Sequence, residues 1–490
     1  MLNIGIRFNK KDFEYDVYSL VRAFYPQSQV QMYYLDEEHA GEYQLLLLVT
    51  YGSQEICLEI EKKGEQVLSR KAAVDYAKDR TQTKNVLKQL VYGALQTLTG
   101  ISLPWGNLTG IRPTKIPMKL LEEGWKNTEI AAYMRDTYGV SKEKTALAIT
   151  IANRERAILS ELDYEKGYSL YVGIPFCPSI CLYCSFGSHP LDRWVKRVDE
   201  YLDALCKELT FIREVMGERK LNTVYIGGGT PTTLEPHQLH RLLSHIRDTF
   251  DFTHVKEYTV EAGRPDSITR EKLEVLRQFP VDRISVNPQT MNQKTLDLIG
   301  RKHTVEDTRR IFRMAREMGF SNINMDLIIG LPGEGRDEVA YTLEEIEKLH
   351  PDSLTVHSLA LKRATRLNLF RDQYEEMSFE NSQEIMEMTQ TCARNMGMGP
   401  YYLYRQKNIA GNFENVGYAE VDKAGIYNIL IMEEKQTILA AGAGASTKFV
   451  FEHGTRIERV ENVKDVNHYI QRIDEMLERK RAGIAAYLEP

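Results

Sequence analysis

From about residue 168 onwards, short apolar runs alternate with longer segments in which apolar residues recur at helical spacing. Short apolar runs are typical of buried strands, and apolar positions three and four residues apart indicate amphipathic helices. The pattern predicts strands at Tyr168–Ile174, Thr223–Ile226, Tyr258–Glu261, Arg283–Val286, Ile323–Ile329 and Ser353–Ser358. It predicts helices between them over residues 195–212, 237–250, 270–279, 305–318 and 338–349. Strands separated by helices are typical of parallel β/α units, so we expect an α/β fold, a partial parallel (β/α)6 barrel over residues 166–375.

The preceding part of the chain has a different order of elements. Its apolar pattern predicts strands at Leu2–Phe8, Gln29–Leu35, Tyr43–Thr50 and Gln54–Glu61, and a helix at Asp12–Phe24. The Gly-Ser pair between Tyr51 and Gln54 is typical of a hairpin turn. Further helices are predicted over residues 86–98, 115–123, 128–138 and 142–162. We therefore expect an N-terminal α+β module over residues 1–100 and a helical connector over residues 101–165.

The last part of the chain, residues 376–490, again mixes both kinds of pattern. A helix is predicted at Phe379–Met396, a strand at Thr437–Leu439 just before a run of Gly and Ala, and a final amphipathic helix around Ile473 and Leu477. We expect this α+β extension to pack against the barrel and close one side of it.

Composition narrows the function classes. A chain of 490 residues is long enough for two or three domains. Its formal net charge of −6 argues against a general nucleic-acid binder. The N-terminus has no basic region followed by a long apolar run, and the most apolar stretch, Leu45–Tyr51, is too short to span a bilayer. We expect a cytoplasmic protein without a membrane span.

Three of the six cysteines, Cys177, Cys181 and Cys184, stand together with the spacing C-x3-C-x2-C. Thiolates suit zinc or iron–sulfur clusters, and a cubane cluster normally takes four cysteines. Three ligands leave one iron of a 4Fe–4S cluster open to a molecule that is not protein, which makes a site for chemistry. The alternative is a structural zinc site in which His189 completes a tetrahedron. The scattered Cys206 and Cys392 fit core packing better than chemistry.

Residues capable of chemistry fall at the ends of the predicted strands. They are the cysteines, Gly227-Gly-Gly-Thr230, Glu261, Asn287 with Gln289, Asp326 and His357. Each by itself has a simpler interpretation, Glu261 or Asp326 as a helix cap and Arg301 as a surface charge. Active sites of α/β barrels gather at the C-terminal ends of the strands, so their shared position favours a site.

The cysteine spacing, with Tyr183 just before the last cysteine, resembles the signature of the radical S-adenosylmethionine (radical SAM) enzymes. Six segments in order resemble the oxygen-independent coproporphyrinogen III oxidase group, and within it the HemZ-type branch of coproporphyrinogen dehydrogenases. These segments are Tyr171–Cys177, Gly227–Thr232, Glu261–Asp266, Arg283–Gln289, Ile299–His303 and Asn324–Gly333. The resemblance covers roughly residues 168–450.

The resemblance implies which residues hold the cofactors. Cys177, Cys181 and Cys184 would ligate the 4Fe–4S cluster, and Tyr171, Gly228 and Glu261 would contact the S-adenosylmethionine bound to it. A second S-adenosylmethionine would contact the positions Tyr183, Gly229, Thr230, Gln289, Arg301, Asp326, His357 and Ala445. Such roles suit the residue types, because carboxylates accept hydrogen bonds from ribose hydroxyls or an amino group and Arg301 can pair with a carboxylate.

The resemblance also implies a reaction. Flavodoxin or ferredoxin would reduce the cluster, and the resulting 5′-deoxyadenosyl radical would start the oxidative decarboxylation of coproporphyrinogen III to protoporphyrinogen IX. The oxidase has a further cysteine where this chain has Phe186. A haem chaperone, and a methyltransferase or haem-opening enzyme, therefore remain alternatives. Candidate cations for the substrate carboxylates are Lys362, Arg363, Arg366, Arg405 and Lys407.

Overall fold

The structure is a computed structural model, and it describes residues 2–35, 42–77, 79–110, 112–185, 187–360, 365–369, 379–406 and 413–488. The chain divides into two compact units. The first comprises Met1–Asn153 and Arg405–Phe413, and the second comprises Arg154–Tyr404 and Glu414–Pro490.

The first unit contains a five-stranded sheet in the order β2-β1-β3-β4-β5. Its strands are β1 (Asn3–Phe8), β2 (Gln29–Tyr34), β3 (Leu45–Tyr51), β4 (Glu55–Lys62) and β5 (Glu65–Ala73). The strand β1 pairs in parallel with both β2 and β3, and β3, β4 and β5 form an antiparallel meander. The predicted hairpin turn is confirmed, because the Gly52 amide donates to the Glu55 carbonyl at 2.8 Å.

Helices of the first unit match the predicted ones within a few residues. They are α1 (Glu14–Phe24), α2 (Arg80–Thr99), α3 (Lys115–Glu122) and α4 (Asn127–Tyr138), and α5 (Lys142–Leu159) follows. Apolar residues of α1, α2 and the sheet form one buried core. The edge strand β5 was not predicted, because most of its side chains are polar and none is buried. An exposed edge strand shows no apolar alternation for a sequence pattern to detect.

The second unit is built on an eleven-stranded sheet. Six neighbouring parallel strands form its centre and confirm the predicted (β/α)6 arrangement. In sheet order they are β6 (Tyr168–Ile174), β9 (Leu221–Gly228), β10 (Glu257–Val260), β11 (Arg283–Ser285), β12 (Ile323–Ile329) and β13 (Ser353–Ser358). Because the strands are parallel, all their carboxyl ends lie at one edge of the sheet.

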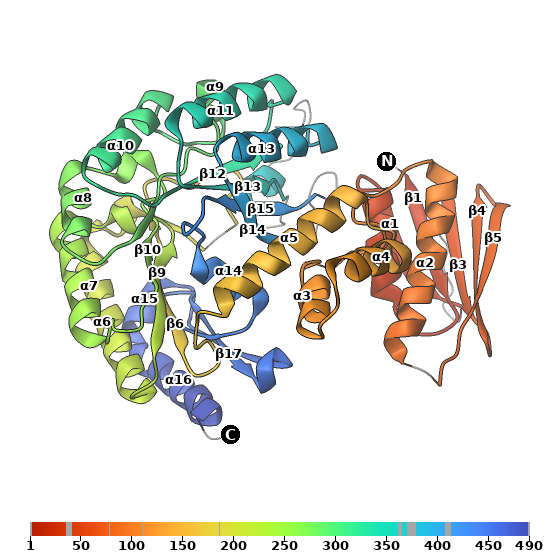
Figure 1. Cartoon of the computed structure of the whole chain (residues 1–490), viewed down its shortest axis with the longest axis horizontal. Coiled ribbons are helices and arrows are strands. Elements are labelled where there is room, and N and C mark those ends of the chain that lie inside the picture. The colour runs from red at the N-terminus through yellow and green to blue at the C-terminus, as the bar shows by residue number, and fades with distance from the viewer. Residues whose placement is uncertain are drawn as a thin grey trace. The chain divides into compact units, whose positions relative to one another are not determined.

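Helices connect these strands and lie on their outer side (Figure 1). They are α6 (Val198–Met216), α7 (Pro236–Thr249), α8 (Arg270–Arg277), α9 (Gln293–Leu298), α10 (Val305–Glu317) and α11 (Arg336–Leu349). Each has a buried apolar face; in α6 the residues Leu202, Leu205, Leu209 and Ile212 are all fully buried. A helical apolar stripe facing a strand with both faces covered is the arrangement that the sequence pattern predicted.

The C-terminal extension adds strands to both edges of the parallel sheet. The strand β15 (Asn415–Ala419) pairs antiparallel with β13, and β14 (Gly399–Tyr404) lies outside it. At the other edge β16 (Thr437–Ala441) pairs in parallel with β6, followed by β17 (Ser446–Phe451) and β18 (Arg456–Glu461). The prediction placed the extension on one side only, because the apolar pattern of a strand does not say which edge it joins.

Two short strands and five further helices are also described in the second unit. They are β7 (Phe176–Cys177) and β8 (His189–Pro190), which pair with each other, and the helices α12 (Arg366–Leu369), α13 (Gln383–Asn395), α14 (Ile426–Glu433), α15 (Val466–Gln471) and α16 (Ile473–Leu488). Among the residues that the structure describes, no helix is long and apolar enough to cross a membrane.

A buried ion pair attaches the C-terminal helix α16 to the barrel. The side chains of Lys480 and Glu208 are both 0% exposed and lie 2.5 Å apart. The Glu208 carboxylate also accepts hydrogen bonds from the Asn462 amide group and from the backbone N–H of Gly442, both at 2.8 Å. Removing one partner of such a pair leaves an uncompensated buried charge, which destabilises a protein by about 3–5 kcal/mol.

Candidate active site

The three clustered cysteines lie on the loop that follows β6. Cys177 ends β7, Cys177 and Cys181 are buried, and Cys184 is half-buried. None of the three forms a disulfide. The loop is attached to the barrel by its backbone, since the Leu182 amide donates to the Ile299 carbonyl at 2.9 Å.

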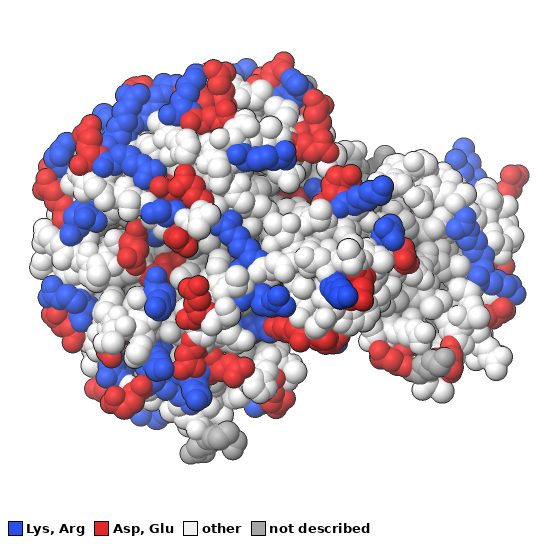
Figure 2. All heavy atoms as spheres, viewed as in Figure 1, with Lys and Arg blue, Asp and Glu red and all other residues white. Residues whose placement is uncertain are grey.

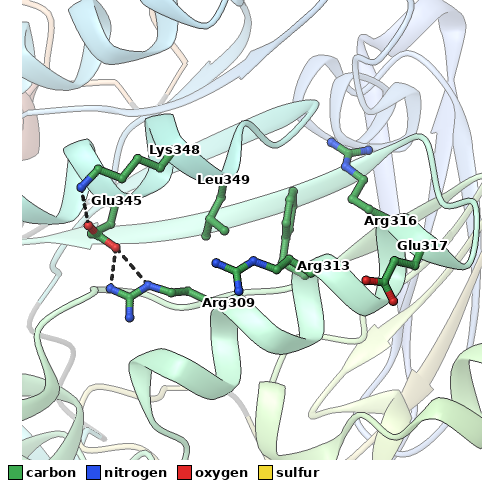
Figure 3. A pocket seen from close by; sticks show the side chains of 8 residues that line it. Arg309, Arg313, Arg316, Glu317, Glu345, Lys348 and Leu349 are labelled. Carbon is green, nitrogen blue, oxygen red and sulfur yellow. Dashed lines mark hydrogen bonds and ion pairs between the residues drawn. The ribbon is translucent and has the colours of Figure 1, made fainter.

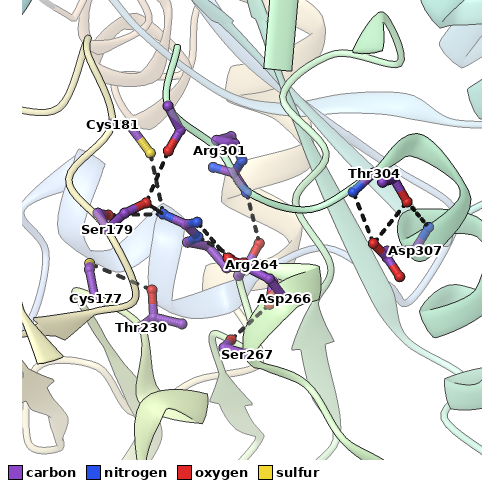
Figure 4. A network of polar contacts seen from close by, with 12 residues as sticks. Cys177, Ser179, Cys181, Thr230, Arg264, Asp266, Ser267, Arg301, Thr304 and Asp307 are labelled. Atoms are coloured by element: carbon purple, nitrogen blue, oxygen red, sulfur yellow. Dashed lines mark hydrogen bonds and ion pairs between the residues drawn. The ribbon is translucent and has the colours of Figure 1, made fainter. Parts of the chain in front are cut away.

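Each thiol has a polar neighbour. The Thr230 hydroxyl lies 3.6 Å from the Cys177 sulfur, and an Nη atom of Arg264 lies 3.7 Å from the Cys181 sulfur (Figure 4). The Cys184 sulfur lies 3.9 Å from the Ser188 hydroxyl. Hydrogen-bond donors beside sulfur stabilise thiolate over thiol.

The three thiols fit an iron–sulfur cluster. Burial raises the pKa of the Cys177 thiol, and the nearby sulfurs of Cys184 and Cys181 raise it further, against the hydrogen bonds from Thr230 and Ser188. Three thiols that lie close enough to interact in this way need a cationic group to become thiolates together. In a cubane each thiolate binds a different iron, so the sulfurs need not converge on one point.

The zinc alternative would need the ring of His189 as its fourth ligand. The ring of His189 packs edge-on against Trp194, with 5.6 Å between the ring centroids. Within the described part of the chain, no three His, Cys, Asp or Glu side chains are arranged to hold a single metal ion.

The glycine triplet brings the end of β9 against the start of the cysteine loop. The Gly229 amide donates to the Ile174 carbonyl and the Thr230 amide to the Phe176 carbonyl, both at 2.7 Å. A Cβ atom on Gly229 would lie 2.5 Å from the Phe176 carbonyl oxygen, so no other residue fits without a shift of the backbone. Gly228 has a φ of +109°, which also favours glycine.

Glu261 directly follows β10 and is half-buried. Its carboxylate accepts hydrogen bonds from the hydroxyl of Tyr225 and from the backbone N–H of Gly228. Burial nevertheless raises the pKa of Glu261 to about 7, with the Asp326 charge adding to the rise. The Tyr171 hydroxyl lies 3.2 Å from the position of a Cβ on Gly228. The structure thus brings together Tyr171, Gly228 and Glu261, the three predicted contacts of the cluster-bound S-adenosylmethionine.

Three tyrosine rings form the wall beside Glu261. The rings of Tyr225 and Tyr427 stack with 4.4 Å between their centroids. Tyr171 stacks against both, at 6.2 Å from Tyr225 and 6.3 Å from Tyr427. Tyr427 comes from α14 of the C-terminal extension, so that extension supplies one side of the candidate site.

Asp326 lies in the middle of β12 and points its carboxylate at amide donors. It accepts hydrogen bonds from the side chains of Asn287 at 2.8 Å and Asn324 at 2.7 Å. His357 Nε2 lies 3.9 Å away, and the other ring nitrogen lies 3.2 Å from the Tyr404 hydroxyl. Burial alone would raise the pKa of Asp326, but His357 and Asn324 outweigh it and hold the pKa below its usual value. Asp326 therefore carries its charge, and it is not a helix cap.

Arg301 is buried, with 4% of its surface exposed, so it is not an ordinary surface charge. Its guanidinium donates to the Tyr183 hydroxyl at 3.1 Å and to the Asn287 carbonyl at 2.6 Å. Gln289, which follows β11, has a φ of +69°. Its backbone N–H donates to the backbone carbonyl of Asp326 at 3.0 Å. The structure thus brings Tyr183 beside Arg301, and Gln289 beside Asp326.

Several buried polar atoms of this part of the site have no hydrogen-bond partner among the described residues. They are Gln289 Oε1, Asn287 Oδ1, Arg301 Nε and both ring nitrogens of His303. Buried polar atoms are normally paired, and each unpaired one costs about 1–3 kcal/mol. Unpaired donors and acceptors at one place are what a site for a polar ligand requires.

The remaining predicted contact, Ala445, lies between β16 and β17 and is buried. Its amide donates to the Gly442 carbonyl at 3.2 Å, and its Cβ lies 3.9 Å from the position of a Cβ on Gly173. Ala445 therefore lies beside the end of β6, at the same edge of the sheet as the cysteine loop.

The candidate cations for substrate carboxylates are only partly described. Phe186, Lys362, Arg363 and Lys407 lie outside the described residues. Arg366 is exposed. Arg405, in the first unit, is buried, donates to the Leu108 carbonyl at 2.6 Å and lies 5.8 Å from the centroid of the Trp105 ring. The guanidinium of Arg405 is therefore bound by contacts within the first unit.

Arg264 and His303 were not predicted as functional residues, although both belong to the segments that carry the family resemblance. His303 is 1% exposed, and burial lowers its pKa to about 3, so it is neutral. The sequence could have pointed to them only through their place in the segments Glu261–Asp266 and Ile299–His303. It could not show that both side chains are buried beside the site.

A hollow of about 400 Å³ lies between α10 and α11 and is lined by none of these residues. Figure 2 shows basic side chains gathered over α10. In the hollow, Glu345 pairs with Arg309 at 2.5 Å and with Lys348 at 2.8 Å (Figure 3). Arg309 and Lys348 thus neutralise the charge of the buried Glu345, and this pairing assigns no chemistry to the hollow.

Comparison with known proteins agrees with the fold and the cysteine loop. Residues 171–346 match the model of the Radical SAM superfamily. The solved structure of coproporphyrinogen III oxidase (HemN) from Escherichia coli, a radical SAM enzyme, superposes with a TM-score of 0.51 and 25% identity, over 66% of this chain and 73% of that one. The fold and the site thus define a radical SAM enzyme, a class that uses a 4Fe–4S cluster and S-adenosylmethionine.

Relatives narrow this class. The oxygen-independent coproporphyrinogen-III oxidase-like protein HemZ of Bacillus subtilis is 39% identical over 94% of this chain and 93% of its own length. The haem chaperone HemW of the same organism is 33% identical over 63% of this chain and 76% of its own. Oxygen-independent coproporphyrinogen III oxidase of Salmonella typhimurium is 27% identical over 64% of this chain and 66% of its own. The chain belongs to the HemN/HemZ family of radical SAM enzymes.

Proposed function

We propose that this protein oxidatively decarboxylates the propionate side chains of coproporphyrinogen III, giving the vinyl groups of protoporphyrinogen IX. The relatives that are named as coproporphyrinogen III oxidases or as oxidase-like support this substrate class. The observation that carries the proposal is the set of unpaired buried polar atoms around Gln289 and Arg301, at the strand ends next to the cysteine loop. A site of this kind suits a polar molecule that binds and leaves in each cycle.

In this proposal Cys177, Cys181 and Cys184 hold the cluster. When bound, the cluster and S-adenosylmethionine supply the reductive cleavage that produces a 5′-deoxyadenosyl radical. An external one-electron donor such as flavodoxin or ferredoxin provides the electron. The protein contributes binding, orientation and the exclusion of water.

Glu261 and the glycines orient the first S-adenosylmethionine. The Glu261 carboxylate, already held by Tyr225 and Gly228, accepts hydrogen bonds from the amino or ribose groups. The close approach of Gly229 to the cysteine loop holds the end of β9 against the segment that carries Cys177. The stacked rings of Tyr171, Tyr225 and Tyr427 exclude water from this side.

Asp326, Gln289, Arg301 and Tyr183 bind a second polar ligand, which we propose to be another S-adenosylmethionine. Asp326 is ionised and accepts hydrogen bonds from hydroxyl or amino groups. Arg301 is anchored through Tyr183 and the Asn287 carbonyl, which leaves its Nε free for a carboxylate. Gly229 and Thr230, which lie against the cysteine loop, are further proposed contacts, and His357 and Ala445 lie at the same edge.

The bound cofactors would remove one hydrogen atom from the β-carbon of a propionate, and 5′-deoxyadenosine would result. The substrate radical then loses carbon dioxide and one electron, and a vinyl group remains. The step therefore requires an electron acceptor in addition to the donor that starts it.

Anaerobic incubation of the reconstituted protein tests the proposal. Reductant, S-adenosylmethionine and coproporphyrinogen III are supplied, and porphyrins, carbon dioxide and 5′-deoxyadenosine are measured. We expect vinyl product with carbon dioxide in equal amounts, and none from the matched Cys181→Ala protein. Formation of 5′-deoxyadenosine without vinyl product or carbon dioxide would contradict the substrate assignment.

A second candidate function is a haem chaperone. It is favoured by the 33% identity to HemW and by Phe186, which replaces the additional cysteine of the oxidase. This alternative predicts stoichiometric, tight haem binding that does not depend on S-adenosylmethionine, together with no turnover of coproporphyrinogen III. Haem titration followed by absorbance, in the same preparation, separates the two.

A further inference from the structure

A buried arginine, Arg264, touches the cysteine loop from the neighbouring loop of the barrel. It lies between β10 and α8, 83 residues after Cys181 along the chain, and only 4% of its surface is exposed. One nitrogen of its guanidinium, Nη1, lies 3.7 Å from the Cys181 sulfur. The same nitrogen donates to the carbonyl oxygen and to the hydroxyl of Ser179, both at 2.9 Å (Figure 4).

The charge of Arg264 is compensated on its other side by Asp266. The two groups form a two-pronged ion pair, with Nε 2.9 Å from Oδ1 and Nη2 2.6 Å from Oδ2. A buried guanidinium is retained only where it is paired and hydrogen-bonded. Arg264 therefore has its ion-pair partner on one side and is free to direct Nη1 at the cysteine loop on the other.

These contacts allow two effects. Through Ser179, Arg264 fixes the loop segment between Cys177 and Cys181, and the Ser179 hydroxyl is fixed in turn by the Gly300 carbonyl at 2.9 Å. Through its charge, Arg264 places a cationic donor beside the sulfur of Cys181. A hydrogen bond to a ligating sulfur becomes charge-assisted when that sulfur is a thiolate, and such bonds raise the reduction potential of an iron–sulfur cluster.

We propose that Arg264 is a positioning residue that raises the reduction potential of the cluster through the Cys181 sulfur, and that Asp266 limits this rise. Addition of one electron makes the cluster more negative, and the nearby guanidinium stabilises that added charge. The carboxylate of Asp266 acts with the opposite sign. The inference rests on the proposed ligation of the cluster by the three cysteines and not on the porphyrinogen substrate.

The test is a redox titration of the full-length, cluster-loaded protein, followed by the electron paramagnetic resonance signal of the reduced cluster and carried out without porphyrinogen. At the wild-type midpoint we expect the ratio of reduced to oxidised cluster to fall about tenfold in Arg264→Gln, which corresponds to 59 mV for a one-electron couple. Arg264→Lys, which keeps the charge, should stay within about twofold of wild type. Asp266→Asn should shift the ratio in the opposite direction, towards reduced cluster.

Arg270→Gln is the matched control, because Arg270 is exposed at the start of α8 and its charge is screened by solvent. It should leave the midpoint unchanged. An unchanged midpoint in Arg264→Gln at full iron content would overturn the proposal. A shift of the midpoint in the same direction in Arg264→Gln and Asp266→Asn would also overturn it. The two side chains carry opposite charges, so an electrostatic effect must shift the midpoint in opposite directions, whereas disruption of the loop need not.

Iron content separates this inference from the ligation that it presupposes. If Cys181→Ala keeps a complete cluster, the assumed ligands are wrong. If Cys181→Ala loses the cluster but the midpoint potential of Arg264→Gln equals that of wild type, only the role of Arg264 is wrong. Should Arg264→Gln fail to retain iron, Asp266→Asn decides: a shift towards reduced cluster supports the proposal, and no shift or the opposite shift overturns it.

Discussion

Two parts of the candidate site lie at the same edge of one sheet and differ in how their polar atoms are paired. In the cysteine-loop region (Cys177, Cys181, Thr230 and Arg264), each buried donor has an acceptor, and the sulfurs of both cysteines lie beside donors. In the open polar region (Asn287, Gln289, Arg301 and His303), side-chain atoms are buried without hydrogen-bond partners among the described residues.

The difference distinguishes a permanent group from an exchangeable one. A cluster that stays bound through every cycle can be surrounded by a fixed, fully paired shell. A ligand that comes and goes must find unpaired donors and acceptors, and the protein bears their cost while the site is empty. Glu261, at the end of β10, is itself paired, but its raised pKa makes its charge depend on pH.

The largest effect should come from the cysteine-loop region. We expect Cys181→Ala to lose the 4Fe–4S cluster entirely after anaerobic reconstitution, because two thiolates do not retain a cubane. Iron and sulfide content and the visible absorbance of the cluster measure this. Cys206→Ala is the control, since Cys206 is a half-buried thiol on α6, away from the loop, and its loss should leave the cluster intact.

The next largest effect should come from the contact between the glycine triplet and the cysteine loop. In Gly229→Ala the new Cβ would meet the carbonyl oxygens of Phe176 at 2.5 Å and Ile174 at 2.9 Å. We expect a loss of about 2–4 kcal/mol in the free energy of unfolding, measured by denaturant titration. Gly187→Ala has open space around its Cβ and should change stability by less than about 0.5 kcal/mol. Equal stability of the two variants would show that the close approach is not needed.

A smaller effect is expected at Glu261, and it depends on pH. Its raised pKa of about 7 means that the carboxyl is protonated below pH 7 and ionised above it. If the ionised form binds S-adenosylmethionine, affinity should rise by up to about tenfold per unit as pH approaches 7 from below, and then level off. Calorimetric titration gives the affinity of wild type and of Glu261→Gln at each pH. In the ratio of the two affinities, the effect of the ligand's own protonation cancels.

Tyr225→Phe sharpens that measurement. The Tyr225 hydrogen bond lowers the pKa of Glu261, so its removal should move the inflection to higher pH. If the affinities of wild type and Tyr225→Phe, each divided by that of Glu261→Gln, do not change with pH, Glu261 does not bind the ligand.

The smallest effect is expected in the open polar region. Gln289→Asn shortens the side chain by one methylene and keeps a residue that tolerates the positive φ at this position. We expect unchanged thermal stability, because the Gln289 side-chain oxygen has no partner to lose. We expect affinity for the second S-adenosylmethionine, measured as binding stoichiometry and Kd, to fall by about fivefold to tenfold. A drop in stability with unchanged binding would make Gln289 structural.

The pattern of apolar residues predicted the six strands of the parallel sheet and most of the helices between them, because each has a buried or amphipathic stretch of several residues. It did not predict α9, which has only six residues. It did not predict β5, whose side chains are mostly polar. Nor did it indicate that β15 joins one edge of the sheet and β16 the other. Edge choice depends on pairings between residues far apart in the chain, which leave no local signal.

The candidate site shows the same division. The spacing of the three cysteines and the glycine triplet are local features, so the chemistry of thiolates and of close backbone approach could be inferred from them. The burial of Arg301 and His303, the raised pKa of Glu261 and the lowered pKa of Asp326 depend on neighbours from other strands.

The sequence by itself determined the ligand chemistry of this protein and the order of its elements, because both depend on residues close together in the chain. Only the tertiary structure decided that Arg264 lies against Cys181, that Tyr427 completes a wall of rings, and that polar atoms near Gln289 stay unpaired. The physical reason is that parallel strands gather their carboxyl ends at one edge, where residues from distant segments meet and alter each other's hydration and charge.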